Sequence, residues 1–246
     1  MSKYGLIILR IVTMRKIMLS LVALSLPLSA WAADDIDAQL LAMAGQFETG
    51  KAEHRIKSIT YDVAEQNNTQ AGVNISRQTD KFSNVKLFSS EHANVKRKIS
   101  CVKGRPDAKS LILLNHWELK WAMGEQGFVT QNIQINPVPA QWNANGGTFQ
   151  SSAVLVDRNG QIDLKEQCRL GSSEDAAVIH RKLKGAMQRV SCTLTMNNQT
   201  GTMKLTQGFE GYYLPGYQIF IPRILLVTNN KTGRVDRLDY QIQKIR

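Results

Sequence analysis

The sequence predicts an α+β fold built on a large curved antiparallel sheet or half-barrel, with an N-terminal helix and a second helix near residues 174–186. Three observations predict this class. Apolar and polar residues alternate through most of the chain, as they do in half-buried strands. Turn sequences join several of these stretches, and two other stretches carry apolar residues at helical spacing. The order of helix, strands, helix and hairpins is typical of an α+β domain.

Helical spacing occurs in two places. Residues 34–50 carry one apolar face with a repeat of three or four residues, formed by Ile36, Leu40, Met43, Ala44 and Phe47. Residues 174–186 follow Ser172 and Ser173, either of which can cap a helix. The apolar stripe of this second stretch consists of Ile179, Leu183 and Met187. We expect both apolar faces to pack against the sheet.

Turn sequences place the hairpins. Residues 157–160 read Asp-Arg-Asn-Gly between two alternating stretches, and Asn-Gly favours a tight hairpin because both residues tolerate positive φ. Residues 197–201 and 229–233 share the pattern Asn-Asn-x-Thr-Gly, which indicates two further hairpins. The Pro- and Gly-containing segment 136–147 could divide the fold into halves. Otherwise residues 33–246 are expected to form one domain.

The N-terminal segment, residues 1–32, has the features of a secretory signal peptide. It combines basic residues with the apolar run 17–28, which is too short for the roughly 20 residues of a membrane span. Ala30 and Ala32 form a small-x-small site, so we expect cleavage before Ala33 and a periplasmic mature protein. An uncleaved anchor is the alternative. The basic residues are Lys3, Arg10, Arg15 and Lys16.

The chain is basic, with a formal net charge of +11 over 246 residues. Loss of the four positive charges of the signal peptide would leave +7. In the cell envelope this charge suits anionic lipid head groups, acidic polysaccharide or an acidic protein, and it also promotes solubility. Nucleic acid is not an expected partner in that compartment. Whether Met1 or Met14 starts the chain stays open.

Three cysteines constrain the chemistry: Cys101, Cys168 and Cys192. An oxidising compartment favours one disulfide. We prefer the pairing Cys168–Cys192, because the second predicted helix would bring their flanking segments together, although pairing through Cys101 stays open. None of the spacings is that of a zinc ligand set or of a redox C-x-x-C motif. We therefore expect no metal and no cofactor.

No catalytic motif surrounds the four histidines, His54, His92, His116 and His180, and the serines lack a G-x-S-x-G context. Two other features suggest binding. The second predicted helix is basic, and an aromatic run punctuated by Gly and Pro follows it later in the chain. The candidate ligand- or partner-binding residues are Arg181, Lys182, Lys184, Arg189, Tyr212, Tyr213 and Tyr217.

These observations favour an exported periplasmic protein that is not an enzyme and that binds an anionic or amphiphilic envelope ligand between its N-terminal helix and its sheet. Peripheral membrane contact is part of this hypothesis. Two alternatives stay open. The first is an accessory or assembly factor of an envelope secretion or surface-fibre complex, acting by protein–protein contact through an edge strand or loop. The second is a hydrolase with a non-local site, which needs His54, His92 or His116 within hydrogen-bond reach of a nucleophile or carboxylate in a cleft.

Overall fold

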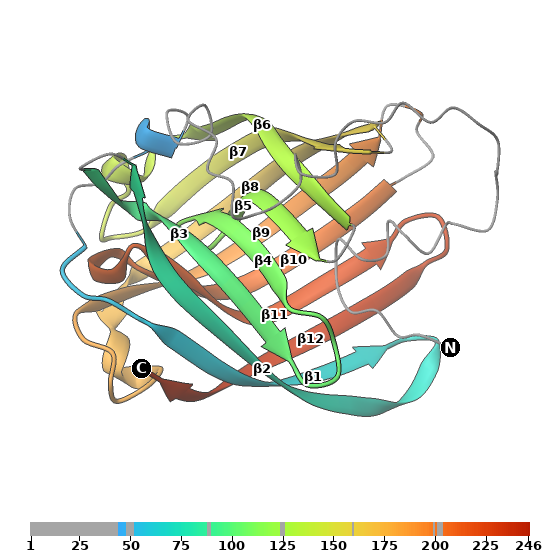
Figure 1. Cartoon of the computed structure of the whole chain (residues 1–246), viewed down its shortest axis with the longest axis horizontal. Coiled ribbons are helices and arrows are strands. Elements are labelled where there is room, and N and C mark those ends of the chain that lie inside the picture. The colour runs from blue at the N-terminus through green and yellow to red at the C-terminus, as the bar shows by residue number, and fades with distance from the viewer. Residues whose placement is uncertain are drawn as a thin grey trace. The chain divides into compact units, whose positions relative to one another are not determined.

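The computed structural model describes residues 44–47, 52–87, 90–123, 126–158, 160–198, 200 and 204–246. Within these ranges, twelve antiparallel strands follow one another around a closed barrel (Figure 1). They are β1 (Ser58–Asn67), β2 (Gln70–Leu87), β3 (Ser90–Val102), β4 (Ala108–Leu113), β5 (Trp117–Met123), β6 (Gln126–Asn136), β7 (Gly147–Asp157), β8 (Gly160–Asp175), β9 (Ala186–Asn198), β10 (Lys204–Leu214), β11 (Ile219–Asn229) and β12 (Arg234–Ile245). Three short 3₁₀ helices connect strands: η3 (Pro139–Gln141), η4 (Ala176–Val178) and η5 (Pro215–Tyr217).

Closure of the sheet corrects the predicted fold class. The expected α+β half-barrel is wrong, because β1 pairs with β12 from Ile59↔Ile245 to Asn67↔Asp236 and so closes the ring of strands. The antiparallel character of the sheet is as expected. Among the described residues, no helix has the length and apolar character needed to cross a membrane.

The predicted helix at residues 174–186 is also wrong. Glu174 and Asp175 are the last residues of β8 and pair with Met187 and Ala186 of β9. The connection between these strands contains only the 3₁₀ turn η4, whose first free N–H is capped by Asp175. The prediction rested on only three apolar residues at helical spacing. One of them, Met187, lies in β9, because the pairing of β8 with β9 determines its conformation.

The predicted N-terminal helix and the signal peptide fall mostly outside the described residues. Of residues 34–50, only 44–47 are described, and there Ala44 and Phe47 are buried. Asn94 of β3 donates a side-chain hydrogen bond to the carbonyl of Ala44, 3.1 Å away. The segment 136–147 is the connection between the neighbouring strands β6 and β7, and it contains η3.

The two ends of the barrel differ. One end, on the left in Figure 1, carries the longer connections β6–β7, β8–β9 and β10–β11 with their 3₁₀ helices, and we call it the long-loop end. The opposite end carries short turns such as β1–β2 and β11–β12, and we call it the hairpin end. The turns predicted at 157–160 and 229–233 lie at the hairpin end.

An aromatic cluster fills the barrel near the long-loop end. Trp142, beside η3, stacks on Phe149 of β7 with ring centroids 4.5 Å apart. Tyr213 of β10 and Phe220 of β11 lie within 6 Å of Trp142, and Phe220 also contacts Trp117. Edge-to-face and stacked contacts of this kind add to the free energy gained from area burial. Side chains therefore occupy this part of the interior.

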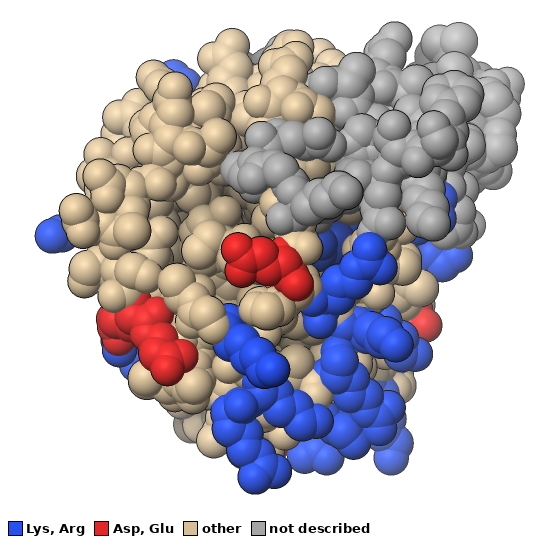
Figure 2. Space-filling view, turned by 90° about the vertical axis from the view of Figure 1, so that its left-hand side faces the viewer, with Lys and Arg blue, Asp and Glu red and all other residues tan. Residues whose placement is uncertain are grey.

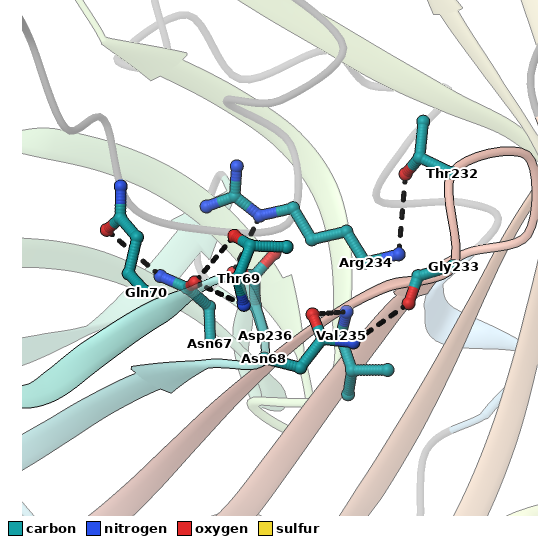
Figure 3. Close-up of polar contacts among 9 residues, drawn as sticks. All are labelled: Asn67, Asn68, Thr69, Gln70, Thr232, Gly233, Arg234, Val235 and Asp236. Atoms are coloured by element: carbon teal, nitrogen blue, oxygen red, sulfur yellow. Dashed lines mark hydrogen bonds and ion pairs between the residues drawn. The ribbon is translucent and has the colours of Figure 1, made fainter.

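The hairpin end is held together by Asn68, in the β1–β2 turn (Figure 3). Its side-chain amide donates to the Gly233 carbonyl at 3.0 Å, and its Oδ1 accepts from the Val235 N–H at 2.9 Å. The backbone N–H of Asn68 also donates to the Val235 carbonyl at 3.1 Å. One side chain thus joins the β1–β2 turn to the β11–β12 turn, where the barrel closes.

Replacing Asn68 by Ala should lower the free energy of unfolding by about 1–2 kcal/mol, because two hydrogen bonds are lost. Urea unfolding followed by tryptophan fluorescence measures the change. Gln70→Ala is the matched control, since its side chain accepts only from Asn67 in the same turn. An equal effect of both substitutions would contradict the role of Asn68 at the closure.

Candidate functional site

The connection between β8 and β9, residues 176–185, forms a fixed basic loop at the long-loop end. The N–H of Ala176 donates to the Gly185 carbonyl at 2.9 Å and closes the loop at its base. Leu183 is buried and anchors it. The N–H of Lys184 donates to the Tyr217 hydroxyl at 3.0 Å, and the Nζ of Lys182 donates to the Ile245 carbonyl at 3.2 Å. The loop is therefore held against both η5 and the end of β12.

Exposed cations surround this loop. The N–H groups of Lys57 and Ser58 donate to the carbonyl of Arg246, so the start of β1 lies beside the end of β12. Figure 2 shows Lys and Arg gathered over the lower part of the long-loop end. We call this the basic end surface, and its exposed residues are Lys57, Arg181, Lys182, Lys184, Lys244 and Arg246. Like charges this close together raise the local concentration of anions.

The pKa of His180 is affected by burial and by the same positive charges. Partial burial lowers its pKa, and the positive charges of Lys182 and Arg181 lower it further. Its Nδ1 also accepts a hydrogen bond from the N–H of Lys182 at 3.2 Å. His180 therefore helps to fix the loop rather than adding charge at neutral pH.

The structure brings three of the four predicted basic residues together. Arg181, Lys182 and Lys184 lie on the loop, whereas Arg189 is on β9 and pairs with Glu174 at 2.8 and 3.2 Å. That pair neutralises Arg189, so it does not add to the basic end surface.

The three predicted tyrosines have structural contacts. Tyr213 is buried in the aromatic cluster, and burial raises its pKa well above the usual value. Tyr217 is buried in η5, where it contacts the His54 ring at 5.0 Å and accepts from Lys184. Tyr212 is half-buried on β10, opposite Arg189 of β9.

A second group of polar residues lies inside the barrel and was not identified from the sequence. Glu166 of β8 accepts from His116 Nε2 on Oε1 at 2.8 Å. Its other oxygen, Oε2, accepts from Ser151 Oγ at 2.8 Å and from Trp117 Nε1 at 3.1 Å. The side chains of His116 and Glu166 are 7% and 6% exposed. We call these four residues the interior polar cluster.

The electrostatics of Glu166 reflect its partners. Burial alone would raise the pKa of this carboxyl, but the positive charge of His116 and the hydrogen bonds from His116, Ser151 and Trp117 outweigh burial and lower it. The His116 ring lies against Trp117, Phe209 and Phe220, with centroids 4.6 to 4.9 Å apart. The cluster is thus a hydrogen-bonded His–Glu pair enclosed by aromatic rings.

Cys168 and Cys192 form a disulfide beside this cluster, in agreement with the pairing preferred from the sequence. They face each other directly in the β8–β9 register and are both buried. The predicted helix does not bring the two cysteines together; the pairing of β8 with β9 does. Cys101, on β3, is not disulfide-bonded.

The interior polar cluster places His116 within hydrogen-bond reach of a carboxylate, as the hydrolase alternative requires, but it does not pair a nucleophile with that histidine. His116 is within hydrogen-bond distance of a carboxylate, but Ser151 donates to Glu166 rather than to His116. Nucleophilic catalysis requires the base to accept the proton of the nucleophile. The His54 ring contacts the Tyr217 ring at a tilt, and the side chain of His92 lies outside the described part of the structure.

The fold and these two groups of residues define an all-β barrel protein with a basic end and a buried polar cluster. No protein-family model matches the chain, and no curated protein matches it in sequence. Solved structures with a similar fold include a domain from Vibrio parahaemolyticus described as an outer membrane lipoprotein-sorting protein (8% identity, TM-score 0.41, 85% of this chain and 90% of that one). The hypothetical lipoprotein YmcC of Escherichia coli also matches (9% identity, TM-score 0.36, 85% of this chain and 100% of that one).

A third similar structure is an exported protein of Bacteroides fragilis with a YmcC-like fold (8% identity, TM-score 0.32, 79% of this chain and 98% of that one). All three likenesses are too distant to assign a function. The function is therefore inferred from the residues of this chain.

Proposed function

We propose that this protein is an exported, non-enzymatic binding protein of the cell envelope that contacts anionic lipid head groups through the basic end surface. The observation that carries the proposal is the fixed loop 176–185. Its basic side chains, Arg181, Lys182 and Lys184, are exposed. The loop is held in place because the Lys184 N–H donates to the Tyr217 hydroxyl and the Lys182 Nζ donates to the Ile245 carbonyl. A loop that is already ordered loses little conformational entropy when it binds.

An exposed apolar side chain on the same loop favours a lipid surface over a soluble acid. Val178, at the end of η4, is 70% exposed. An aliphatic group beside several cations is the combination that interfacial segments use, because the cations meet phosphates while the aliphatic group enters the head-group boundary. Each Lys or Arg near an anionic membrane surface contributes about 1 kcal/mol.

Vesicle co-sedimentation tests this proposal with the full chain. We expect binding to vesicles that contain phosphatidylglycerol, little binding to pure phosphatidylcholine, and loss of binding as salt rises. Arg181→Glu/Lys182→Glu/Lys184→Glu should weaken binding at least 100-fold, because about 3 kcal/mol of attraction is removed and repulsion is added. Val178→Asp should weaken it further in the same direction.

The matched control makes the same change of charge at the hairpin end, as Lys103→Glu/Arg158→Glu/Lys231→Glu. All three residues are exposed there. If both triple variants lose binding equally, net charge rather than the basic end surface accounts for it. Equal binding of the wild type to neutral and anionic vesicles would also overturn the proposal.

A second candidate function, an assembly factor that acts by protein–protein contact, rests on β2. Among the described strands, β3 pairs with β2 only from Gln78 onward, so residues 70–77 have one edge without a partner strand. Val73 and Ile75, on this stretch, are 50% and 75% exposed. An exposed edge with apolar side chains favours the addition of an extended segment. Val73→Lys/Ile75→Lys should then remove a co-purifying envelope protein and leave vesicle binding unchanged.

A further inference from the structure

Four metal-ligating side chains meet inside the barrel: His116, Glu166, Cys168 and Cys192. One ligand atom from each lies within 4.8 Å of all the others. His116 comes from the β4–β5 connection, Glu166 and Cys168 are neighbours on the inner face of β8, and Cys192 faces Cys168 from β9. Because His116 and Cys192 are far in the chain from Glu166 and Cys168, the spacing gave no sign of a metal site.

This set of donors matches the preference of zinc. Two sulfurs, one imidazole nitrogen and one carboxylate oxygen can bind Zn²⁺ in a tetrahedron, at about 2.3 Å for sulfur and about 2.0–2.2 Å for nitrogen and oxygen. Such a tetrahedron places its ligand atoms about 3.3–3.8 Å apart. The two sulfurs, bonded to each other in the disulfide, would have to separate after reduction, whereas ligand atoms at the 4.8 Å limit would have to close by about 1 Å. A site with four protein ligands leaves no open position, so it is structural rather than catalytic.

The surroundings of Glu166 are already arranged for a metal ligand. Ser151 and Trp117 both donate to Oε2, which fixes the carboxylate, while Oε1 points to His116. In metal sites, hydrogen bonds of this kind orient the ligating carboxylate. A cation that enters beside Oε1 would replace the proton shared by His116 and Glu166.

We infer that the dithiol form of this protein binds Zn²⁺ at these four residues, and that the metal and the disulfide are alternative occupants of one site. When Zn²⁺ binds, two thiols release two protons and form two Zn–S bonds. A disulfide oxidant then reverses the occupancy: the two thiolates give two electrons to the oxidant, the Cys168–Cys192 bond forms, the oxidant leaves as two thiolates, and Zn²⁺ is released. In the disulfide form the sulfurs have no thiolate to offer.

Cobalt titration tests this inference, because Co²⁺ bound to thiolates in a tetrahedral site absorbs strongly in the visible and near ultraviolet. The full chain carrying Cys101→Ser is reduced without oxygen and titrated with Co²⁺, and Zn²⁺ is then added. We expect one equivalent of Co²⁺ with a thiolate charge-transfer band, displacement by one equivalent of Zn²⁺, and no band for the disulfide form. Circular dichroism follows the fold throughout.

Variants separate this site from adventitious thiol binding. Cys168→Ser/Cys192→Ser should lose the charge-transfer band, and His116→Gln or Glu166→Gln should lose the tetrahedral spectrum. Ser151→Ala should keep the spectrum and bind 10- to 100-fold more weakly. If the reduced apo form is unfolded, Zn²⁺ should restore the strand signal. A reduced protein that neither binds one Co²⁺ tetrahedrally nor refolds with Zn²⁺ overturns the inference, as does a spectrum unchanged in His116→Gln. None of these results depends on lipid binding.

Discussion

Replacing Glu166 by Ala is expected to lower the free energy of unfolding by about 3–5 kcal/mol, because each buried donor that loses its acceptor costs about 1–3 kcal/mol. The substitution leaves three buried donors without their acceptor: His116 Nε2, Ser151 Oγ and Trp117 Nε1. Trp117 Nε1 keeps only its bond to Ser151 Oγ, at 3.0 Å. Equilibrium urea unfolding at neutral pH, followed by tryptophan fluorescence, measures the change.

The control for this prediction is Glu174→Ala. Glu174 also forms a hydrogen-bonded ion pair, with Arg189, but at the surface, where solvent screens the pair. We expect its removal to change stability far less than removal of Glu166. Similar effects of the two substitutions would show that the interior polar cluster is not a stabilising unit.

The pH dependence of stability follows from the same carboxyl. The pKa of Glu166 is lowered in the folded protein from its ordinary value of 4.5. A lowered pKa means that the folded state binds the proton more weakly than the unfolded state. Its contribution is therefore fully present above pH 4.5 and is lost as pH falls through the folded-state pKa. The difference in stability between the wild type and Glu166→Gln should shrink over this acid range, and a constant difference would contradict the assignment.

Removing the disulfide has the second large expected effect. Cys168→Ala/Cys192→Ala should lower the free energy of unfolding by about 3 kcal/mol, because the cross-link closes a loop between residues 24 positions apart and restricts the unfolded chain. Both sulfurs are buried, so their loss also leaves space in the core. Thermal or urea unfolding under non-reducing conditions measures the loss.

Cys101→Ser is the internal control for the disulfide prediction. Cys101 is partly exposed on β3, and its thiol donates a hydrogen bond to Asp107 that a serine hydroxyl can also donate. We expect this variant to remain within about 0.5 kcal/mol of the wild type. Stability that depends on Cys101 and not on Cys192 would contradict the pairing in the structure.

The strands and turns of this protein could be predicted because their signals are local. Alternation of apolar residues and the sequences of the 157–160 and 229–233 turns correctly indicated the β7–β8 and β11–β12 hairpins. Closure of the barrel has no local signal, because it depends on pairing between β1 and β12 at opposite ends of the described chain. The helix expected at residues 174–186 failed because the partner of that segment, β9, decides its conformation.

The same distinction applies to the candidate sites. Arg181, Lys182 and Lys184 are close in sequence, so a basic surface could be predicted from the sequence. The pairing of Arg189 with Glu174 could not be predicted in this way, because it depends on the β8–β9 register. The interior polar cluster joins residues from the β4–β5 connection, β5, β7 and β8. Only the three-dimensional fold brings His116, Ser151 and Glu166 together.

Position-specific labelling tests the central claim most directly, which is that the long-loop end contacts an anionic membrane. In a Cys101→Ser background, an environment-sensitive fluorophore is attached to Val178→Cys on the basic loop or to Lys231→Cys at the hairpin end. With phosphatidylglycerol vesicles, the label at position 178 should shift its emission to shorter wavelength and become protected from an aqueous quencher. The label at position 231 should do neither. A label at position 178 that stays in water while the protein is vesicle-bound, or equal protection at both positions, would contradict the account.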